Sequence, residues 1–508
     1  MFKALAMTLI ATSVLASQTT IAADKTRLNV SSPWEITSYE PSVSGFAFYR
    51  LGVMETLVDA TVDGVLVPGL ATDWQMSEDG LSWRFSLRDG VSFHDGSQLT
   101  AEITAEALQR ASANPGILKR APISTIETDK KQVVITLDSP FAALPALLTH
   151  STTVIAAPAS LDKEGSYIAA IGTGPFAVDT FTPPQSLDVK RFADYWGNKA
   201  KLEKVSYLAA GRAETRALLA ESGDADLVFS LDPSGYTRLG EIDAVDTIAV
   251  PIPRVVALKL NAGHKFLEDP RARRALSLAI DRIGIATAIT RFPEATASQL
   301  FPPALDQWHN DKLEPLSQDI EAAKALLAEL GWLAGDDGIL SRDGERFSIL
   351  LRTFPDRPEL PLIAAALQAQ WRAIGIELEV SVSNFSEIPA GHQDGSLHVA
   401  LYARNYGLTP DPIGTVLQDF GPGGGDWGAM NWDSAEVAQA LENIAATNDQ
   451  AVRSSNIATV VDTLHEQLPL IPIVWYQHTV SVATGLEGYV VDPLERKYRL
   501  NNLSWAAE

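Results

Sequence analysis

The chain has 508 residues, 46% of them hydrophobic, which is too long for one hydrophobic core and predicts roughly two to four domains. Its formal net charge of −23 repels phosphate backbones and anionic headgroups, which excludes nucleic acids and membrane surfaces as favourable partners. The sequence contains no cysteine, which excludes disulfides, thiolate metal sites, a cysteine nucleophile and a lipid on an N-terminal cysteine.

Residues 1–23 have the pattern of a secretion signal. Lys3 precedes a mostly apolar run at 4–16, and a short polar stretch then leads to the small residues Ala22 and Ala23. The run is too short to span a bilayer of roughly 30 Å, and small residues after it are typical of a cleavage site. An exported chain without a lipid anchor needs an outer barrier to retain it. We therefore predict a cleaved signal peptide and a periplasmic location.

Strand-like and helix-like segments alternate along the chain, a pattern typical of a mixed α/β architecture. Predicted strands cover 27–30, 83–87, 131–137, 154–157, 346–353 and 468–482. Predicted helices cover 100–111, 214–221, 270–282, 319–330, 362–373 and 434–446. The last strand is long and must join a sheet, because an unpaired edge is costly. We therefore expect the chain to return at its end to a lobe that it left earlier, which builds two lobes around a hinge.

The sequence lacks the standard catalytic signatures, including a Gly-x-Ser-x-Gly elbow, His-Glu-x-x-His and a phosphate-binding loop. The segment 172–174 (Gly-Thr-Gly) is followed by Pro175, which has no N–H for a pyrophosphate, so it is interpreted as a turn. The eight histidines form no spaced metal motif. His478 is of interest because strand alternation places it on one face with Tyr476. The sequence therefore gives no support for an enzyme or for a resident cofactor.

Several segments occur in the order found in one known family. They are 51–58, 67–74, 77–85, 87–96, 172–176, 195–197, 260–261 and 273–282. Together they resemble the extracellular solute-binding proteins of family 5, which serve peptide, opine and nickel importers of the ATP-driven (ABC) type. Asp89-Gly90 and Asp95-Gly96 have the chemistry of turns, so these motifs describe a scaffold and not the cargo.

The resemblance implies an α/β, bilobal periplasmic binding protein fold, with two α/β lobes joined at a hinge plus a small inserted subdomain. Its expected partners are a small-molecule ligand and the permease and ATPase subunits of an ABC importer, and the expected state is a monomer. The expected division of the chain is a signal peptide at 1–23, lobe I at 24–65, 175–260 and 479–508, an inserted subdomain of lobe I at 66–174, and lobe II at 261–478.

The resemblance also bears on the cargo. Dipeptide binders of this family place an aspartate a few residues before the Asp-Pro that corresponds to Asp411-Pro412, and Leu408 stands at that position here. Nickel-chelate binders have an arginine and an aromatic residue in this stretch, which correspond to Arg404 and Tyr406. The resemblance therefore disfavours an ordinary dipeptide.

Two further positions concern a metal chelate. The arginine that clamps the chelate's carboxylate in some relatives corresponds to His150 or Ser151, so that clamp is missing, whereas His478 corresponds to a histidine that other nickel-chelate binders use. The resulting candidate ligand-binding residues are Arg404, Tyr406, His478, Tyr402, Tyr476, Arg50, Trp427 and His150, with His478 as the candidate metal ligand.

Three functional hypotheses remain open. The first is a binder of a nickel chelate, such as nickel with free histidine, in which His478 completes the coordination, because imidazole suits nickel. The second is a binder of a short peptide or an opine, in which Arg404 or Arg50 clamps a carboxylate through two parallel hydrogen bonds. The third is a secreted hydrolase, which no motif in the sequence supports.

Overall fold

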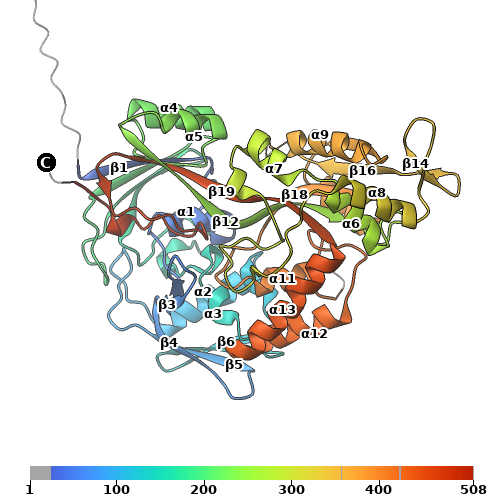
Figure 1. Cartoon of the computed structure of the whole chain (residues 1–508). Helices are drawn as coiled ribbons and strands as arrows, with labels where there is room; N and C mark the ends of the chain where they lie inside the picture. Colours follow the sequence, from blue (N-terminus) through green and yellow to red (C-terminus); the bar gives the residue numbers. More distant parts are fainter. Residues whose placement is uncertain (1–24, 356, 358, 423–424, 507–508) are drawn as a thin grey trace, which may run out of the picture.

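The computed structural model describes residues 25–506 except 356, 358, 423 and 424, so the predicted signal peptide at 1–23 lies outside the described residues. Its largest feature is one ten-stranded mixed sheet (Figure 1). The strand order across this sheet is β17 (Glu377–Val382), β16 (Ser348–Thr353), β18 (Val399–Asn405), β12 (Val245–Leu260), β19 (Leu470–Ala483), β11 (Leu227–Phe229), β1 (Arg27–Ser32), β10 (Lys204–Ala209), β9 (Ser186–Arg191) and β8 (Phe176–Thr182).

Two long antiparallel strands, β12 and β19, run through both halves of the sheet (Figure 1). In lobe I, β19 pairs with β11, whereas in lobe II β12 pairs with β18 over residues 254–260. The register of β12 against β19 shifts between Pro251 and Val255, where Pro251 and Pro253 cannot donate to the ladder. The strand predicted at 468–482 is confirmed as β19. This irregular point lies where the chain passes from one lobe to the other, although the predicted domain division itself stays a prediction.

Helices cover both faces of the sheet. In Figure 1, α4 and α5 lie above the lobe I half, α7 and α9 lie above the lobe II half, and α11, α12 and α13 lie below it. The helices of these two parts are α1 (Pro41–Arg50), α4 (Ala213–Ser222), α5 (Pro233–Leu239), α6 (Pro270–Leu278), α7 (Arg282–Ile285), α8 (Ile320–Glu329), α9 (Glu359–Arg372), α10 (Glu387–Gln393), α11 (Ile413–Phe420), α12 (Ala435–Ala446) and α13 (Gln450–Gln467). None of the helices described is long and apolar enough to cross a membrane.

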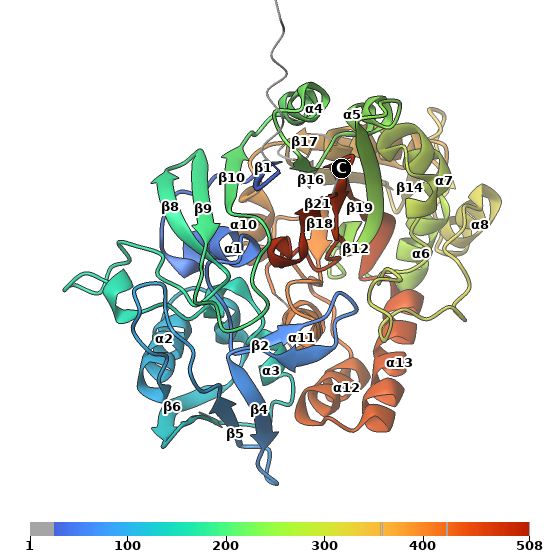
Figure 2. The same cartoon turned by 90° about the vertical axis from the view of Figure 1, so that its left-hand side faces the viewer.

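Within residues 66–174, four strands form a separate small sheet accompanied by two α-helices, at the bottom of Figures 1 and 2. Its elements are β4 (Ala71–Met76), β5 (Ser82–Leu87), β7 (Gln132–Leu137) and β6 (Ile123–Asp129) in sheet order, with α2 (Ala101–Ala113), η1 (Ile117–Arg120), α3 (Leu144–Leu147), η2 (Ser151–Thr153) and η3 (Pro158–Ser160). The remaining short elements are β2 (Val58–Ala60), β3 (Leu66–Pro68), η4 (Ala286–Thr290), η5 (Pro293–Ala295), β13 (Leu333–Ala334), β14 (Leu340–Arg342), β15 (Glu345–Arg346), β20 (Leu486–Glu487), η6 (Leu500–Asn502) and β21 (Ser504–Trp505).

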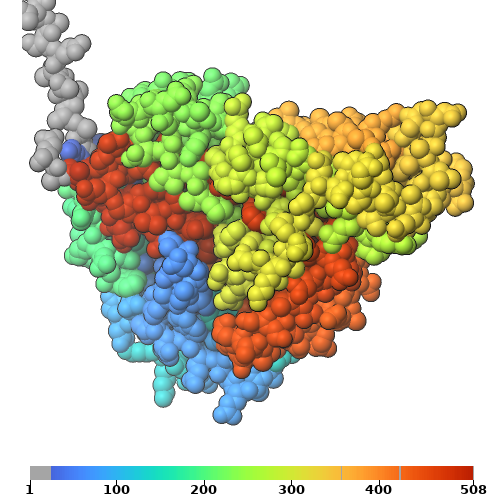
Figure 3. All heavy atoms as spheres, viewed as in Figure 1, coloured from blue at the N-terminus to red at the C-terminus, as the bar shows by residue number. Residues whose placement is uncertain are grey.

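The subdomain packs directly against lobe II. Buried Leu147 of α3 and Val416 of α11 belong to one apolar core, and the amide of Ala142 donates a hydrogen bond to the carbonyl of Ala445 at 2.6 Å. Lobe I has a separate core. In the space-filling view, the blue residues of the subdomain meet the orange-red helices of lobe II without a gap on the face shown (Figure 3). We call this contact between the subdomain and lobe II the seam, and the structure is therefore a closed form.

Local signals correctly predicted several helix starts. The side chain of Asp319 accepts a hydrogen bond from the amide of Ala322 at the start of α8, and Ser434 caps α12 in the same way through Val437. The predicted α/β class is confirmed.

Two predicted elements are shorter in the structure than predicted. The helix predicted at 270–282 ends at Leu278, because the side chain of Asp281 caps a new helix through the amide of Gly284. The strand predicted at 154–157 is reduced to a single bridge between Ile155 and Glu55, since Pro158 and two 3-10 turns bracket it.

Candidate ligand-binding site

The predicted ligand-binding residues lie in two separate clusters. One cluster lies near α11 and the seam and contains Tyr402, Arg404, Tyr406 and Trp427, with His150 on the subdomain side. The other lies around Glu495, where the C-terminal segment meets the crossing strands, and contains Arg50, Tyr476 and His478. The sequence suggested one site, whereas the structure distributes these residues over two.

Arg404 has its strongest partner inside the protein. Its Nε and Nη2 donate to the two carboxylate oxygens of Asp419 on α11, at 2.6 and 2.5 Å, and the side chain of Asp419 is completely buried. Tyr402 donates its hydroxyl hydrogen to the carbonyl of Trp427 at 2.6 Å, and the buried ring of Tyr406 packs against Phe301. This bidentate pair uses one edge of the guanidinium, which leaves Nη1 for other partners.

Arg120, which the sequence did not indicate, brings a second guanidinium to this place. It extends from η1 across the seam, where its Nη1 donates to Oγ1 of Thr415 on α11 at 2.5 Å. Within the described part of the chain, Arg120 has no ion-pair partner of its own. Burial and the neighbouring Arg404 lower the pKa of Arg120 to about 10, while Asp419 opposes this shift. The cluster therefore has two guanidiniums and one carboxylate, an excess of positive charge.

His150 adds a neutral hydrogen-bond donor beside Arg120. Its Nδ1 accepts the amide hydrogen of Thr152, so a neutral ring must carry its proton on Nε2. Burial and the charge of Arg120 lower the pKa of His150 to about 4, so the ring is neutral at pH 7. The seam thus offers the donors of Arg120, His150 and Thr415, a combination that suits a carboxylate.

Glu495 is the centre of the second cluster. Its Oε2 lies 3.0 Å from Nη2 of Arg254, its Oε1 lies 3.6 Å from Nδ1 of His478, and its carbonyl accepts a hydrogen bond from Nε of Arg50 at 2.8 Å. Burial alone would raise the pKa of Glu495, but Arg254, His478 and Arg50 lower it to about 2. The segment that carries Glu495 is thereby tied to both crossing strands of the hinge.

Tyr476 lies between two arginines beside this cluster. The guanidinium carbons of Arg254 and Arg357 are each 5.2 Å from the centroid of its ring, and Nη1 of Arg357 donates to its hydroxyl oxygen at 3.1 Å. Such a stack holds charged groups of lobe II and the crossing strands together.

His478 lies in surroundings that are unfavourable for a cation. Its ring stacks on Phe229, burial lowers its pKa, and both Arg50 and Arg254 lower it further, although Glu495 opposes them. Among the described residues, no group of three or more His, Cys, Asp or Glu side chains could hold a metal ion. A metal bound to His478 would need its other ligands from a chelator. The role of His478 as a metal ligand stays a prediction.

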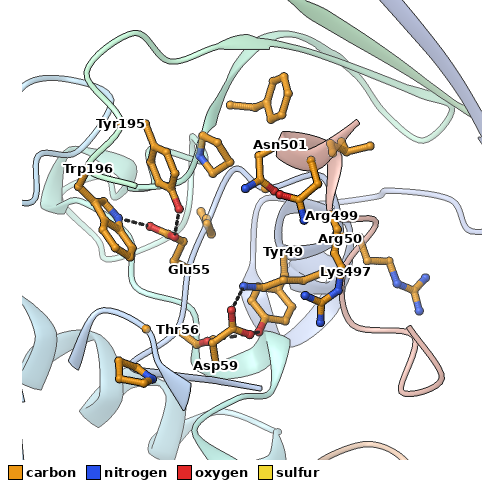
Figure 4. A pocket seen from close by; sticks show the side chains of 18 residues that line it. Tyr49, Arg50, Glu55, Thr56, Asp59, Tyr195, Trp196, Lys497, Arg499 and Asn501 are labelled. Carbon is orange, nitrogen blue, oxygen red and sulfur yellow. Dashed lines mark hydrogen bonds and ion pairs between the residues drawn. The ribbon is translucent and has the colours of Figure 1, made fainter. Parts of the chain in front are cut away.

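A cavity of about 150 Å³ lies beside Arg50 in lobe I (Figure 4). On one wall, the carboxylate of Glu55 accepts hydrogen bonds from Thr173, Tyr195 and Trp196 at 2.8–2.9 Å. Glu55 and its donors come from three of the segments that carry the resemblance, 51–58, 172–176 and 195–197. The best-matched motifs thus meet at one buried carboxylate of the scaffold.

Two α/β lobes, joined by crossing strands and closed over buried charged groups, define the class of periplasmic binding proteins. The sequence model described as "Bacterial extracellular solute-binding proteins, family 5 Middle" matches residues 65–427, and the chain belongs to this family.

Individual relatives agree with this assignment. The chain is 28% identical over 444 residues to the nickel-binding periplasmic protein of Escherichia coli strain K12, covering 84% of each chain. It is 26% identical over 475 residues to the dipeptide-binding protein of the same strain, covering 86% of each. The crystal structure of a nickel ABC transporter protein from Bacillus halodurans matches with a TM-score of 0.79 and 26% identity, over 94% of this chain and 99% of that one.

These findings confirm the predicted family and the bilobal α/β fold. The protein is a solute-binding protein of an ABC importer, and its relatives are substrate-binding proteins, not enzymes. The relatives carry names for nickel and for dipeptides, so the cargo has to be argued from the residues at the seam.

Proposed function

We propose that this protein captures a carboxylate-bearing nickel chelate, such as nickel with free histidine, in the periplasm and delivers it as a monomer to the permease of an ABC importer. The observation that carries the proposal is the excess of guanidinium charge at the seam, where Arg120 lies beside the Arg404–Asp419 pair and has no ion-pair partner of its own within the described residues. A carboxylate of the ligand would balance this charge.

The acidic groups near the seam favour a chelate over a peptide. Asp419 is paired with Arg404, and Asp411, which precedes α11, is paired with Arg453 at 2.5 Å. Leu408 offers no charge at the position where the resemblance places an aspartate in dipeptide binders. The α-ammonium of a peptide would have to compete with these arginines for a carboxylate. In a chelate, the amino nitrogen binds the metal and needs no carboxylate from the protein.

The donors of the seam suit the outer surface of such a chelate. Arg120 supplies a charged planar donor group, and His150 and Thr415 supply neutral donors beside it. Because these residues come from the subdomain and from lobe II, a ligand bound by them would favour the closed form. The chelator provides the nitrogen and oxygen ligands in this proposal, and the proposed contribution of His478 is a separate question.

An opine is the second candidate, because an opine carries more carboxylates than amino groups and so also matches the excess guanidinium charge. Isothermal titration of the mature protein with nickel plus histidine, with an opine and with a panel of dipeptides separates these cargoes. We expect saturable binding of nickel-histidine and much weaker binding of dipeptides. Tight binding of a dipeptide without nickel would refute the proposal.

The role of Arg120 can be tested against a matched neighbour. We expect Arg120→Gln to weaken nickel-histidine binding about tenfold or more, because a charge-assisted hydrogen bond contributes about 1.5–3 kcal/mol. Lys119→Gln, at an exposed side chain one residue earlier, should leave the affinity unchanged. Equal affinities of the two variants would show that Arg120 does not contact the ligand.

A further inference from the structure

The cavity in Figure 4 is separate from the seam. It is lined by residues 49–69, 175–196 and 497–502, and lobe II contributes none of the residues found to line it. We propose that this cavity binds a small oxyanion, such as inorganic phosphate or a short carboxylate, through the guanidinium of Arg499.

Arg499 has no carboxylate partner in an ion pair within the described residues, whereas Arg50 lies next to Glu495 and lowers the pKa of its carboxyl group. Nη2 of Arg499 donates to the carbonyl of Ala60 at 3.3 Å, while its buried Nε has no hydrogen-bond partner there. Nε of Arg50 donates to the carbonyl of Glu495. The guanidinium of Arg499 therefore meets a neutral carbonyl oxygen, which leaves its positive charge unbalanced at the cavity.

The carboxylates at the cavity do not balance this charge. Asp59 is paired with Nζ of Lys497 at 2.6 Å, below and to the right of Glu55 in Figure 4. Glu55 lies on the opposite wall, where three neutral donors hold it and burial raises its pKa. The wall that carries Arg499 is therefore the positive one, and a planar guanidinium is well suited to carboxylate and phosphate oxygens.

The backbone near Arg499 directs polar side chains to the cavity. Lys497 and all four residues of 499–502 line it, and Lys497, Arg499 and Asn501 are labelled in Figure 4. The intervening Tyr498 is buried in the core of lobe I. Arg499 has φ of 53°, in the left-handed region that non-glycine residues seldom adopt. Surrounding contacts must hold this unfavourable conformation, and such positions cluster at ligand sites.

The volume limits the size of the ligand. A cavity of about 150 Å³ is comparable to one that holds a single benzene molecule, which is large enough for phosphate or a carboxylate of a few carbon atoms. A complex of nickel with histidine is larger. The oxyanion site would therefore be occupied independently of the transported solute.

Titration calorimetry of the full mature protein in a Tris chloride buffer tests the proposal, with inorganic phosphate and acetate as separate probes. We expect saturable binding of at least one probe at millimolar concentrations. A preference for phosphate or for acetate would identify the kind of oxyanion that the site takes. Absence of saturable binding for both probes would overturn the proposal.

Variants of Arg499 test whether the oxyanion binds in this cavity. Arg499→Gln should weaken the binding about tenfold, as expected for loss of a charge-assisted pair. Arg212→Gln, at an exposed arginine elsewhere in lobe I, should have no effect. Arg499→Lys keeps the charge but loses the planar donor group, so it should give an intermediate affinity. This variant also provides a test if Arg499→Gln does not fold. Unchanged oxyanion affinity in the folded Arg499 variant would overturn the proposed site.

Discussion

Glu55 and Glu495 are both buried glutamates in lobe I, but their surroundings are opposite. Glu55 is held by the neutral donors of Thr173, Tyr195 and Trp196, and burial raises its pKa. Glu495 is held by Arg254 and by the neighbouring His478 and Arg50, which outweigh burial and lower its pKa to about 2. Burial alone therefore does not decide the charge state of a carboxylate in this protein, because the charges of its partners do.

The positions of the two glutamates explain this difference. Glu55 joins segments of one lobe, where neutral hydrogen bonds are sufficient to hold them. Glu495 joins the C-terminal segment to β12 and β19, the strands that cross between the lobes. The charged partners of Glu495 thus lie on the strands that pass between the lobes.

The largest effect is expected from Glu495→Gln. Removing the charge leaves Arg254 and Arg50 buried without their carboxylate, which costs about 3 kcal/mol of unfolding free energy, near the range measured for broken buried pairs. Urea denaturation at pH 7 measures this loss. The matched control is Asp59→Asn in another ion pair of lobe I, Asp59–Lys497, in which the Asp59 side chain is 25% exposed against 11% for that of Glu495, so we expect a smaller loss. Equal losses would contradict the special role of Glu495.

The pH dependence of stability sharpens the same comparison. The pKa of Glu495 is about 2 in the folded protein against an ordinary value of 4.5, so its stabilisation is present above pH 4.5 and is lost as the pH falls towards 2. The difference in stability between wild type and Glu495→Gln should therefore shrink over this range. Denaturation curves of the two proteins from pH 7 to pH 3 measure it, and a constant difference would contradict the lowered pKa.

Sequence reasoning succeeded where interactions are local. The N-caps Asp319 and Ser434 bond to amides three residues later, and these helices were predicted at almost their observed bounds. The fold followed from segment order and from the long strand β19. The site was less predictable, because Arg120 and Thr415 are 295 positions apart and Arg254 and Glu495 are 241 apart. No local pattern in the sequence distinguishes Arg120 from the other arginines of the chain.

His478 tests whether the Glu495 cluster is structural. We expect His478→Gln to lower the unfolding free energy by about 1 kcal/mol, because the glutamine amide keeps a donor near Glu495, whose Oε1 lies 3.6 Å from Nδ1 of His478. The affinity of the variant for nickel-histidine should change less than about twofold, since Arg50 and Arg254 disfavour a cation beside His478. Calorimetry and thermal melts of His478→Gln and His478→Ala measure both quantities. Selective loss of nickel-histidine binding in both variants, with unchanged melting temperature, would establish His478 as a metal ligand.

The smallest effect is expected from Glu55→Gln. Thr173 and Trp196 both donate to Oε2, which the amide oxygen of glutamine can replace, and the amide nitrogen can donate to the hydroxyl oxygen of Tyr195 in place of Oε1. The raised pKa means that the ionised form of Glu55 is disfavoured in the folded protein, so the stability that its neutral form contributes is lost as the pH rises above 4.5. Glutamine is a neutral isostere, and Glu55→Gln should therefore change the unfolding free energy at pH 7 by less than about 1 kcal/mol. Glu55→Ala, which leaves the donors without an acceptor, should cost about 1–3 kcal/mol instead. A glutamine variant as unstable as Glu495→Gln would show that Glu55 acts through its charge and would remove the distinction between the two carboxylates.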